Sequence, residues 1–230
     1  MTVSRHRGDR AGYRLSDPLC WHDVPVPDLV APVVPAGSMC RQPQPVLTVD
    51  ALTLRSWQPA DVSAVVEAYR DPAIQHWHGR SMTEDEAQDW VSSWTGRWAA
   101  ETGAGWAITQ DGAVLGRVGL RTVNLAEGVG EAAYWVLPLA RGHDVAPRAL
   151  QAVTAWVFDH LGLQRVELAH STSNGASCRV ASKAGYALEG TKRQQALHAD
   201  GWHDMHLHAR LRDDPVDVRP ASRTAQPMPA

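Results

Sequence analysis

The sequence predicts an α/β (α+β) domain with one mixed sheet and helices on both of its faces. Strand and helix signals alternate between residues 47 and 214, with too few strand–helix–strand repeats for a doubly wound parallel sheet. A hairpin signature at residues 111–112 and a helix-capping box at residues 83–86 support this order. With 44% hydrophobic and 20% charged residues, a chain of 230 residues can bury a sizeable core.

Proline marks the limits of the domain. Seven of the 15 prolines fall in residues 1–46 and four in residues 215–230, which leaves four for the residues between. The first segment lacks helical or strand periodicity, so we expect residues 1–46 to be a Pro-rich extension that is flexible or loosely docked. Residues 47–214 are expected to form the domain, and residues 215–230 a flexible tail.

The first half of the domain is expected to contain a strand, two helices and a hairpin. Pro59 can occupy the first position of a helix, and Asp71-Pro72 is expected to end that helix at residue 70. The expected elements are a strand around residues 52–54, a helix over 59–70, a helix from 83 through Trp98, and strands over 105–109 and 113–122.

The second half continues the alternation. Gly185 is expected to terminate the last helix as its C′ residue, because glycine adopts positive φ without strain. The expected elements are a strand over residues 131–137, a helix over 146–161, a strand over 165–169, a helix over 176–184, and strands around Tyr186 and over 204–211.

Composition excludes several classes of protein. Twenty-two Lys and Arg against 25 Asp and Glu give a formal charge of −3, which argues against a binder of nucleic-acid phosphates. No run of about 18 apolar residues is present to span a membrane, and no apolar segment follows the basic N-terminus as in a secretion signal. We therefore expect a cytoplasmic protein with no nucleic-acid or membrane partner.

The most informative segment runs from Tyr134 to Ala146. An apolar strand leads into a short loop that immediately opens a helix, and such a junction directs several unpaired backbone N–H groups toward one point. The positive end of the helix dipole lies at the same place. These features favour an anion site suited to a phosphate or pyrophosphate, although an ordinary strand-to-helix turn has the same local sequence.

A second informative segment, further along the chain, reads Asn174-x-x-Ser177-x-x-Val180-x-x-Lys183-x-Gly185-Tyr186. Together with the junction, with residues 52–55 and with residues 71–77, it resembles the GNAT superfamily of acyl-CoA-dependent N-acetyltransferases, and within it the RimJ/RimL-type branch. The resemblance covers about residues 47–211. It implies a GNAT-like mixed, mostly antiparallel sheet with helices on both faces, and acetyl-CoA as the co-substrate.

The resemblance also implies a set of coenzyme contacts. The family's pyrophosphate loop reads Arg/Gln-x-x-Gly-x-Gly/Ala, and Arg141, Asp144 and Ala146 stand at its three fixed positions. Asp144 departs from the pattern, because its side chain can obstruct the pyrophosphate and adds like charge. Asp144 can also turn outward as a helix cap while Gly142 supplies flexibility, so we expect coenzyme A binding to be weakened but retained. The other expected contacts are Val136, Leu137, His143, Val145 and Asn174.

For catalysis, the resemblance implies direct attack of an amine on the thioester in a ternary complex. Glu131 begins the strand that carries the pantetheine contacts and is the expected base, with a solvated glutamate at a strand end as the alternative. Ser177 is the expected partner of the leaving thiol, because Ala181 stands where many members have tyrosine. The alternative for Ser177 is a hydroxyl bonded to its own helix backbone.

The acceptor is expected to be a primary amine, on a small molecule or at a protein N-terminus. Ten tryptophans in the chain favour an acceptor pocket with aromatic walls. Trp77 and Trp202 are predicted to lie in loops and, with His76, are the expected substrate contacts. Trp94 and Trp98, at helical spacing, are expected in the core.

Two further interpretations follow from departures and clusters. Asp144 and Ala181 also fit a non-catalytic acyl-CoA-binding or sensing module, which would bind acetyl-CoA without turnover. A homodimer is considered because dimers are common in families of this kind.

Histidines at positions 198, 203, 206 and 208 raise the question of a metal site. Apolar residues alternate with them as in a half-buried strand with a polar face, so no metal is expected. The three cysteines are widely spaced, which gives neither a disulfide framework nor zinc-ligand spacing. Cys178, on a helix with no histidine paired to it in the sequence, is expected to be a buried structural cysteine.

Overall fold

The computed structural model describes residues 29–215. Residues 1–28 of the expected extension and residues 216–230 of the expected tail lie outside this range. Two units can be distinguished, residues 1–31 and residues 32–230. The fold described below is that of the second unit, as far as residue 215.

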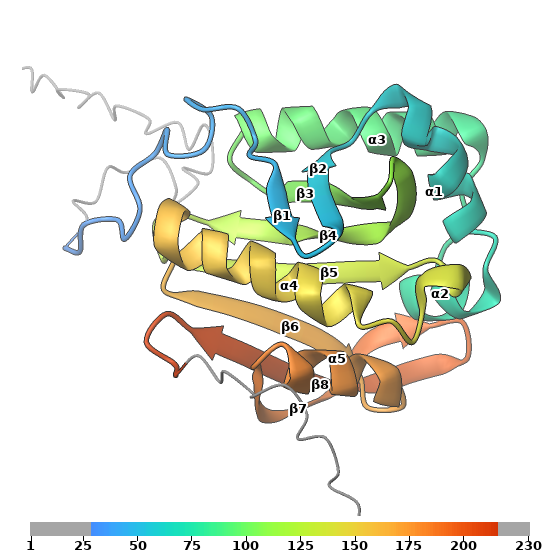
Figure 1. Cartoon of the computed structure of the whole chain (residues 1–230). Helices are drawn as coiled ribbons and strands as arrows, with labels where there is room; N and C mark the ends of the chain where they lie inside the picture. Colours follow the sequence, from blue (N-terminus) through green and yellow to red (C-terminus); the bar gives the residue numbers. More distant parts are fainter. Residues whose placement is uncertain (1–28, 216–230) are drawn as a thin grey trace, which may run out of the picture. The chain divides into compact units, whose positions relative to one another are not determined.

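Eight strands form one sheet (Figure 1). They are β1 (Leu47–Val49), β2 (Leu52–Ser56), β3 (Ala104–Gln110), β4 (Ala113–Asn124), β5 (Val129–Val136), β6 (Arg165–Ser171), β7 (Ala187–His198) and β8 (Gly201–Leu211). Their order in the sheet is β1-β2-β3-β4-β5-β6-β8-β7, and β5 and β6 are the parallel pair in an otherwise antiparallel arrangement. The predicted mixed, mostly antiparallel sheet is therefore confirmed.

Helices cover both faces of this sheet. They are α1 (Val62–Ala68), α2 (Pro72–His78), α3 (Glu84–Ala99), α4 (Val145–Trp156) and α5 (Gly175–Lys183), with a π-helical turn, Val157–Leu161, that extends α4. Figure 1 shows α4 and α5 on the near face of the sheet. None of the helices within residues 29–215 has the length and apolar composition needed to cross a bilayer.

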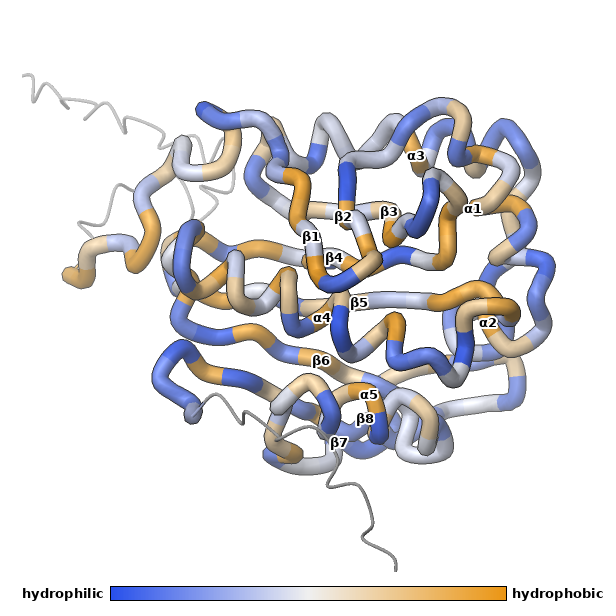
Figure 2. The backbone as a smooth tube through the Cα atoms, viewed as in Figure 1, coloured by the Kyte–Doolittle hydropathy of each residue, from blue (hydrophilic) through white to orange (hydrophobic). Residues whose placement is uncertain are grey.

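Two hydrophobic cores lie against the sheet. Trp106 and Ile108 of β3 pack in the core that also contains buried residues of α4 and α5, while Ala107 packs in the core of α1, α2 and α3. This separation follows from the two-residue period of a strand, which sends successive side chains to opposite faces. Figure 2 shows the corresponding change between hydrophobic and hydrophilic residues along the turns of α4, which buries one side.

One helix and one strand differ from the sequence-based expectation, and each carries a tryptophan that was predicted to lie in a loop. Asp71-Pro72 ends the first helix but also begins α2, because the Asp71 carboxylate accepts the Ile74 N–H at 3.0 Å and Pro72 needs no hydrogen-bond acceptor. Trp77 therefore lies in a helix. Trp202 lies in β8, which pairs with the mainly exposed strand β7.

Residues 33–45 of the N-terminal extension pack against the domain. The side chain of Met39 is fully buried, and the Glu101 carboxylate accepts the backbone N–H groups of Gly37 at 2.7 Å and of Met39 at 2.6 Å. The indole N–H of Trp106 donates to the Pro45 carbonyl at 2.8 Å. The expected boundary at residue 46 thus falls after a segment that contributes to the core. The sequence did not indicate this contribution because the segment has no periodic secondary structure.

The parallel strands β5 and β6 are paired over only three residues each. Val129 to Glu131 pair with Arg165 to Glu167, and beyond these residues no pairs join the two strands. The strands therefore part toward their carboxyl ends. This separation leaves one backbone edge of β5 without a neighbouring strand and positions the site described next.

Candidate active site

A cavity of about 940 Å³ lies where β5 and β6 part. Its walls come from β5, from the loop before α4 and from the first turn of α5, with α2 and β7 contributing further side chains. On one side of the sheet it is bounded by Tyr134 and Ser177, and on the other by Glu131 and Trp135. The cavity therefore passes through the gap in the sheet and connects its two faces.

The open edge of β5 can bind an extended ligand. Leu137 donates its N–H to the Leu115 carbonyl of β4 at 2.9 Å, so alternation turns the backbone groups of Tyr134 and Val136 toward the gap. The Val136 carbonyl accepts a hydrogen bond from Arg141 Nε at 3.2 Å. Both backbone groups of Leu137 are engaged within the chain, since its carbonyl accepts the Ala140 N–H. Of the two predicted positions on this strand, Val136 faces the cavity and Leu137 does not.

The loop before α4 forms a cradle of backbone donors. Gly142 and Asp144 have φ values of +81° and +52°, in the left-handed region. Within residues 29–215, the backbone N–H groups of residues 142–146 donate no hydrogen bond. These donors lie at the N-terminus of a twelve-residue helix, where the helix dipole also favours a negative charge.

Asp144 does not cap α4 as the sequence analysis expected. It is the N-cap residue, but its side chain makes no capping hydrogen bond. Its carboxylate instead pairs with Lys183 Nζ of α5, so that its charge is compensated by a cation at the rim of the cavity. Asp144 thus adopts the left-handed (αL) backbone conformation at the position where the family's pattern has glycine. Aspartate tolerates this conformation better than most residues.

An ion pair of Arg141 connects the loop before α4 to the start of α2. Its guanidinium pairs with Asp71, with Nη2 and Oδ1 2.5 Å apart, and this hydrogen bond holds the pKa of the Asp71 carboxyl below its usual value. Arg141 also lines the cavity. His143, another predicted contact, lies outside the cavity lining.

The first turn of α5 brings two hydroxyl groups together. Asn174 caps the helix by accepting the Ser177 N–H at 3.0 Å, as expected. Ser177 Oγ lies 2.7 Å from the hydroxyl of Tyr134, and burial raises the pKa of this tyrosine to about 12 although the hydrogen bond to Ser177 opposes the shift. The Tyr134 hydroxyl therefore stays protonated at neutral pH and can donate a hydrogen bond.

Tyr134 was missed by the sequence analysis. That analysis sought a tyrosine on α5 and found Ala181, which is fully buried in the core. The alternation of β5 would have revealed Tyr134, because it lies on the face opposite to Glu131 and Trp135, toward α5.

Glu131 lines the cavity at the point where the strands part. Its Oε1 lies 2.7 Å from Arg121 Nη2 of β4, in an ion pair with further hydrogen bonds from the same guanidinium. The ion pair with Arg121 fixes the orientation of the Glu131 carboxylate in the cavity wall. A carboxylate held in this way can accept a proton directly or through an intervening water.

The wall on the side of α2 and α3 is cationic and aromatic. Arg117 is buried, with its Cζ 4.7 Å from the ring centroid of Trp94, and its Nε has no hydrogen-bond partner among residues 29–215. Burial lowers the pKa of Arg117 to about 10, which still leaves it charged at neutral pH. Burial also lowers the pKa of His78, to about 4, so this cavity residue is neutral. The sequence places His78 within the segments expected to wall the acceptor cleft, as observed, but gives no sign of Arg117.

The three predicted acceptor contacts have different positions. Trp77 lines the cavity from α2. His76 lies outside the lining, near the Asp200 carboxylate at 4.0 Å. Trp202 also lies outside it and is 61% exposed, although Leu197, its partner on β7, lines the cavity. The structure therefore brings one of the three to the site.

Comparisons with known proteins agree with this geometry. The family model described as the acetyltransferase (GNAT) domain matches residues 51–187, more than half of the chain. YoaA of Bacillus subtilis (strain 168), named as an N-acetyltransferase, is 24% identical over 169 residues, which are 72% of this chain and 96% of YoaA. The ribosomal-protein-serine acetyltransferase of Escherichia coli (strain K12) is 26% identical over 106 residues, 46% of this chain and 59% of that protein.

A solved structure shares the fold. RimL, described as a ribosomal L7/L12 alpha-N-protein acetyltransferase in complex with coenzyme A, matches with a TM-score of 0.68 at 18% identity and covers 73% of this chain and 98% of its own. The strand order, the two helical layers and the matched family model lead to the same assignment. The chain belongs to the GNAT family of N-acetyltransferases, with RimL-type ribosomal-protein acetyltransferases among its relatives.

Proposed function

We propose that the protein transfers an acetyl group from acetyl-CoA to a primary amine by direct attack in a ternary complex. The observation that supports this most strongly is the set of free backbone donors at residues 142–146 beside the open edge of β5. A diphosphate suits the donors, and a linear chain with amides suits the strand edge. Acetyl-CoA carries both groups in one molecule.

The residues around the cradle would hold the coenzyme. The N–H groups of residues 142–146 would bind the pyrophosphate, and Lys183 would add a charge that offsets Asp144. Tyr134 and Val136 would hydrogen-bond the pantetheine arm through their backbone groups. Asp144 weakens this binding relative to glycine, but its ion pair makes the repulsion smaller than that of a free carboxylate.

Two groups would act on the reacting atoms. Glu131 would accept the proton of the attacking ammonium, directly or through water. The Ser177 and Tyr134 hydroxyls would hydrogen-bond the leaving thiolate, since the tyrosine is protonated at neutral pH. This assignment accounts for Ala181 on α5, because the phenol comes from β5. On this proposal Ala181 no longer favours a non-catalytic sensing module, whereas the departure at Asp144 still fits one.

The acceptor side of the cavity favours an amine that carries an anionic group. Arg117 is buried and has no carboxylate partner within residues 29–215, and Arg97 and Arg121 also line the cavity. A free peptide N-terminus followed by an acidic residue and a small amino acid both satisfy this requirement. The E. coli relative named as a ribosomal-protein-serine acetyltransferase supports the protein acceptor. A cytoplasmic location and a homodimer are further parts of the proposal.

The proposal is tested by coenzyme A release from acetyl-CoA with a panel of amines, arranged in pairs with and without a carboxylate near the amine. We expect turnover with primary amines and a preference for the acidic member of each pair. Glu131→Gln should lower kcat by about a hundredfold or more and leave the affinity for acetyl-CoA within about twofold. Acetyl-CoA binding with no turnover on any amine would refute the enzymatic proposal, and unchanged turnover of Glu131→Gln would refute the choice of base.

A further inference from the structure

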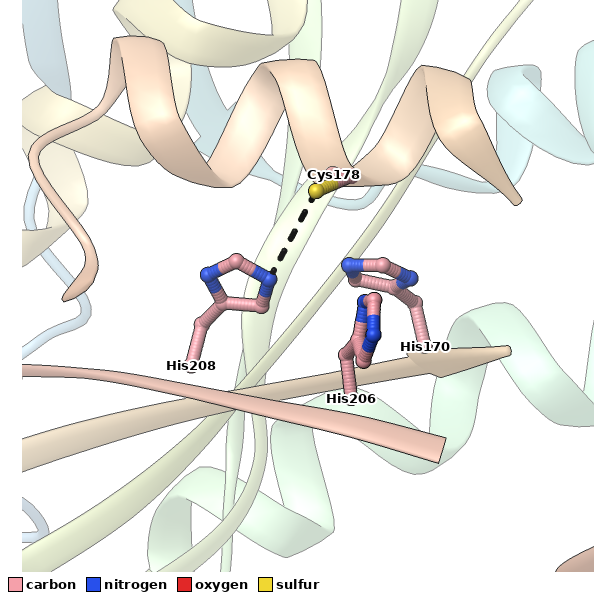
Figure 3. Close-up of side chains that lie close together, drawn as sticks. All are labelled: His170, Cys178, His206 and His208. Carbon is pink, nitrogen blue, oxygen red and sulfur yellow. Dashed lines mark hydrogen bonds between the residues drawn. The ribbon is translucent and has the colours of Figure 1, made fainter. Parts of the chain in front are cut away.

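Four side chains with metal-binding atoms converge under α5. They are His170 of β6, His206 and His208 of β8, and Cys178 of α5. One nitrogen or sulfur atom from each lies within 4.8 Å of the others, and Cys178 Sγ lies 3.9 Å from His208 Nε2. Figure 3 shows the three imidazole rings rising from the strands toward the sulfur on the helix above them.

The register of the sheet brings the histidines together. His170 pairs directly with His206 across β6 and β8, and Leu168, two residues earlier on the same face, pairs with His208. The three side chains therefore share one face of the sheet, with ring centroids 5.4 Å apart for His170 and His206 and 5.0 Å apart for His170 and His208. Leu168 belongs to the core shared with α5, so this face is the one that α5 covers.

This arrangement corrects two expectations from the sequence. The alternation in β8 predicts a half-buried strand whose histidines lie on its polar face, whereas His208 is 1% exposed and lies beneath α5. Cys178 was expected to have no histidine partner, whereas His208 contacts it. The four residues come from three elements, so no local spacing in the sequence indicates that they lie together.

Several polar atoms in the cluster lack partners. His170 is 5% exposed, yet its Nε2 has no hydrogen bond among residues 29–215, and His206 Nδ1 is likewise buried and unpaired there. Leaving a buried nitrogen unpaired costs about 1–3 kcal/mol, so one such atom already calls for an explanation. Two in one cluster, beside a cysteine, point to a ligand that uses their lone pairs.

The other ring nitrogens are oriented for metal binding. His170 Nδ1 lies 2.8 Å from the Ser171 carbonyl, and His208 Nδ1 lies 3.4 Å from the Tyr186 carbonyl. A carbonyl fixes the proton on Nδ1 and leaves Nε2 with a free lone pair, which is the usual outer-shell arrangement of a metal-bound histidine.

We propose that His170, Cys178, His206 and His208 form a structural zinc site that fastens α5 to β6 and β8. One thiolate and three imidazoles are the ligand types that tetrahedral Zn²⁺ prefers, and four protein ligands leave no position open for substrate. Tetrahedral bonding requires ligand atoms about 3.4–3.6 Å apart, and the atoms now lie within 4.8 Å of one another, so the side chains need to close by no more than about 1.4 Å. Binding releases the Cys178 proton to solvent.

The position of the site gives it a consequence for the cavity. Cys178 directly follows Ser177, whose hydroxyl contacts Tyr134, and His170 lines the cavity wall. A metal bond to Cys178 would therefore fix the first turn of α5 beside the proposed thiol partner. The zinc would act on the reaction by positioning this helix and would not contact the substrate.

The test uses the full chain, purified without a polyhistidine tag after growth in zinc-supplemented medium and dialysed against metal-free buffer. Elemental analysis should find about one zinc per chain, and added zinc should raise the melting temperature of the metal-free protein. Cobalt(II) in its place should show the visible bands of a tetrahedral site and a thiolate charge-transfer band. Cys178→Ser should lose that band, and His206→Ala should lose at least tenfold in zinc affinity.

Matched controls come from the same chain. Cys40 and His160 are exposed and lie outside the cluster, so Cys40→Ser and His160→Ala should keep the zinc content and the cobalt spectrum. If Cys178→Ser does not fold, alkylation of the wild-type chain gives the same information. Cys178, identified by mass spectrometry, should be protected while zinc is bound and should react after chelation, whereas Cys40 should react in both states.

Three results would overturn the proposal. The first is a zinc content below about a tenth of an ion per chain even after incubation with zinc salt. The second is a cobalt charge-transfer band that survives in Cys178→Ser or disappears in Cys40→Ser. The third is stoichiometric copper binding under conditions in which zinc is not retained, which would assign the four ligands to a different metal. None of these measurements depends on transferase activity.

Discussion

The hydroxyl groups of Tyr134 and Ser177 lie in contact, although α5 carries Ala181 where many family members have a tyrosine. They lie 2.7 Å apart within the cavity, and they come from a strand and a helix that meet across the gap between β5 and β6. The sequence allowed Ser177 to be named because a helix motif surrounds it. Tyr134 has no such motif. The alternation of β5 predicts the face on which it lies, but its contact with the serine hydroxyl is seen only in the fold.

Removing either hydroxyl should slow the reaction without weakening the binding of acetyl-CoA. We expect Tyr134→Phe and Ser177→Ala each to lower kcat by about tenfold to a hundredfold, with the KM for acetyl-CoA nearly unchanged, because the hydroxyls would act on the leaving thiolate. The double variant should be little worse than either single one, since the groups act as a pair. Steady-state kinetics measures all three.

A second hydroxyl pair provides the control for this prediction. Tyr186 and Thr154 lie 2.6 Å apart in the core, outside the cavity lining. Tyr186→Phe should therefore lower the free energy of unfolding and leave kcat unchanged. If Tyr134→Phe behaves in the same way, the Tyr134 hydroxyl supports the fold only.

The charge of Asp144 should oppose coenzyme binding. Asp144→Asn removes the charge, keeps a residue that tolerates αL, and frees Lys183 to face the pyrophosphate. We expect acetyl-CoA to bind about fivefold more tightly, which corresponds to about 1 kcal/mol from one charge near the surface. Titration calorimetry measures the Kd. Weaker binding by Asp144→Asn would mean that the carboxylate contributes to the cradle.

At the scale of elements, the sequence predicted the long helices and central strands well. The capping box of α3 is present, with Thr83 accepting the Glu86 N–H and Glu86 accepting the Thr83 N–H. It missed α2, because Asp71-Pro72 is a stop signal and a start signal at once. It also missed β1, whose three residues are too few to show a period.

The packing of β4 against its neighbours should depend on glycine. A Cβ at Gly119 would lie 2.1 Å from the Ala104 carbonyl oxygen, a backbone atom that cannot move aside cheaply. Gly119→Ala should therefore lower the free energy of unfolding by about 2 kcal/mol or more. Urea denaturation measures this change.

Gly96 is the matched comparison for Gly119. It lies inside α3 with no atom within 4 Å of the added Cβ. Gly96→Ala should raise the free energy of unfolding by up to about 1 kcal/mol, because alanine favours the helix more than glycine. Equal effects of the two substitutions would show that the contact with Ala104 is not what excludes a side chain at Gly119.

At the scale of the whole molecule, composition could not reveal that residues 33–45 of the extension pack against the domain. Residues 33–45 are held by irregular contacts, chiefly the three backbone donors that converge on Glu101 and the burial of Met39. The same limit applies to the candidate site. The sequence identified the loop at 141–146 and the start of α5, which are continuous motifs. It gave no role to Tyr134 or Arg117, whose positions depend on which strands and helices meet.

The docked segment should contribute to stability. Met39→Ala removes a fully buried side chain and should lower the free energy of unfolding by about 2–5 kcal/mol. Cys40→Ala, at the adjacent exposed position, should change it by less than about 0.5 kcal/mol. Thermal or urea unfolding compares them. Equal small effects would mean that residues 33–45 detach without cost.

The central claim is that the backbone donors before α4 and the open edge of β5 bind acetyl-CoA. A crystal structure of the full chain with acetyl-CoA tests it most directly. We predict pyrophosphate oxygens at about 2.7–3.2 Å from the N–H groups of residues 142–146, with the pantetheine arm along Tyr134 and Val136. A coenzyme bound elsewhere, or a cradle occupied by the Asp144 carboxylate in its presence, would contradict the account.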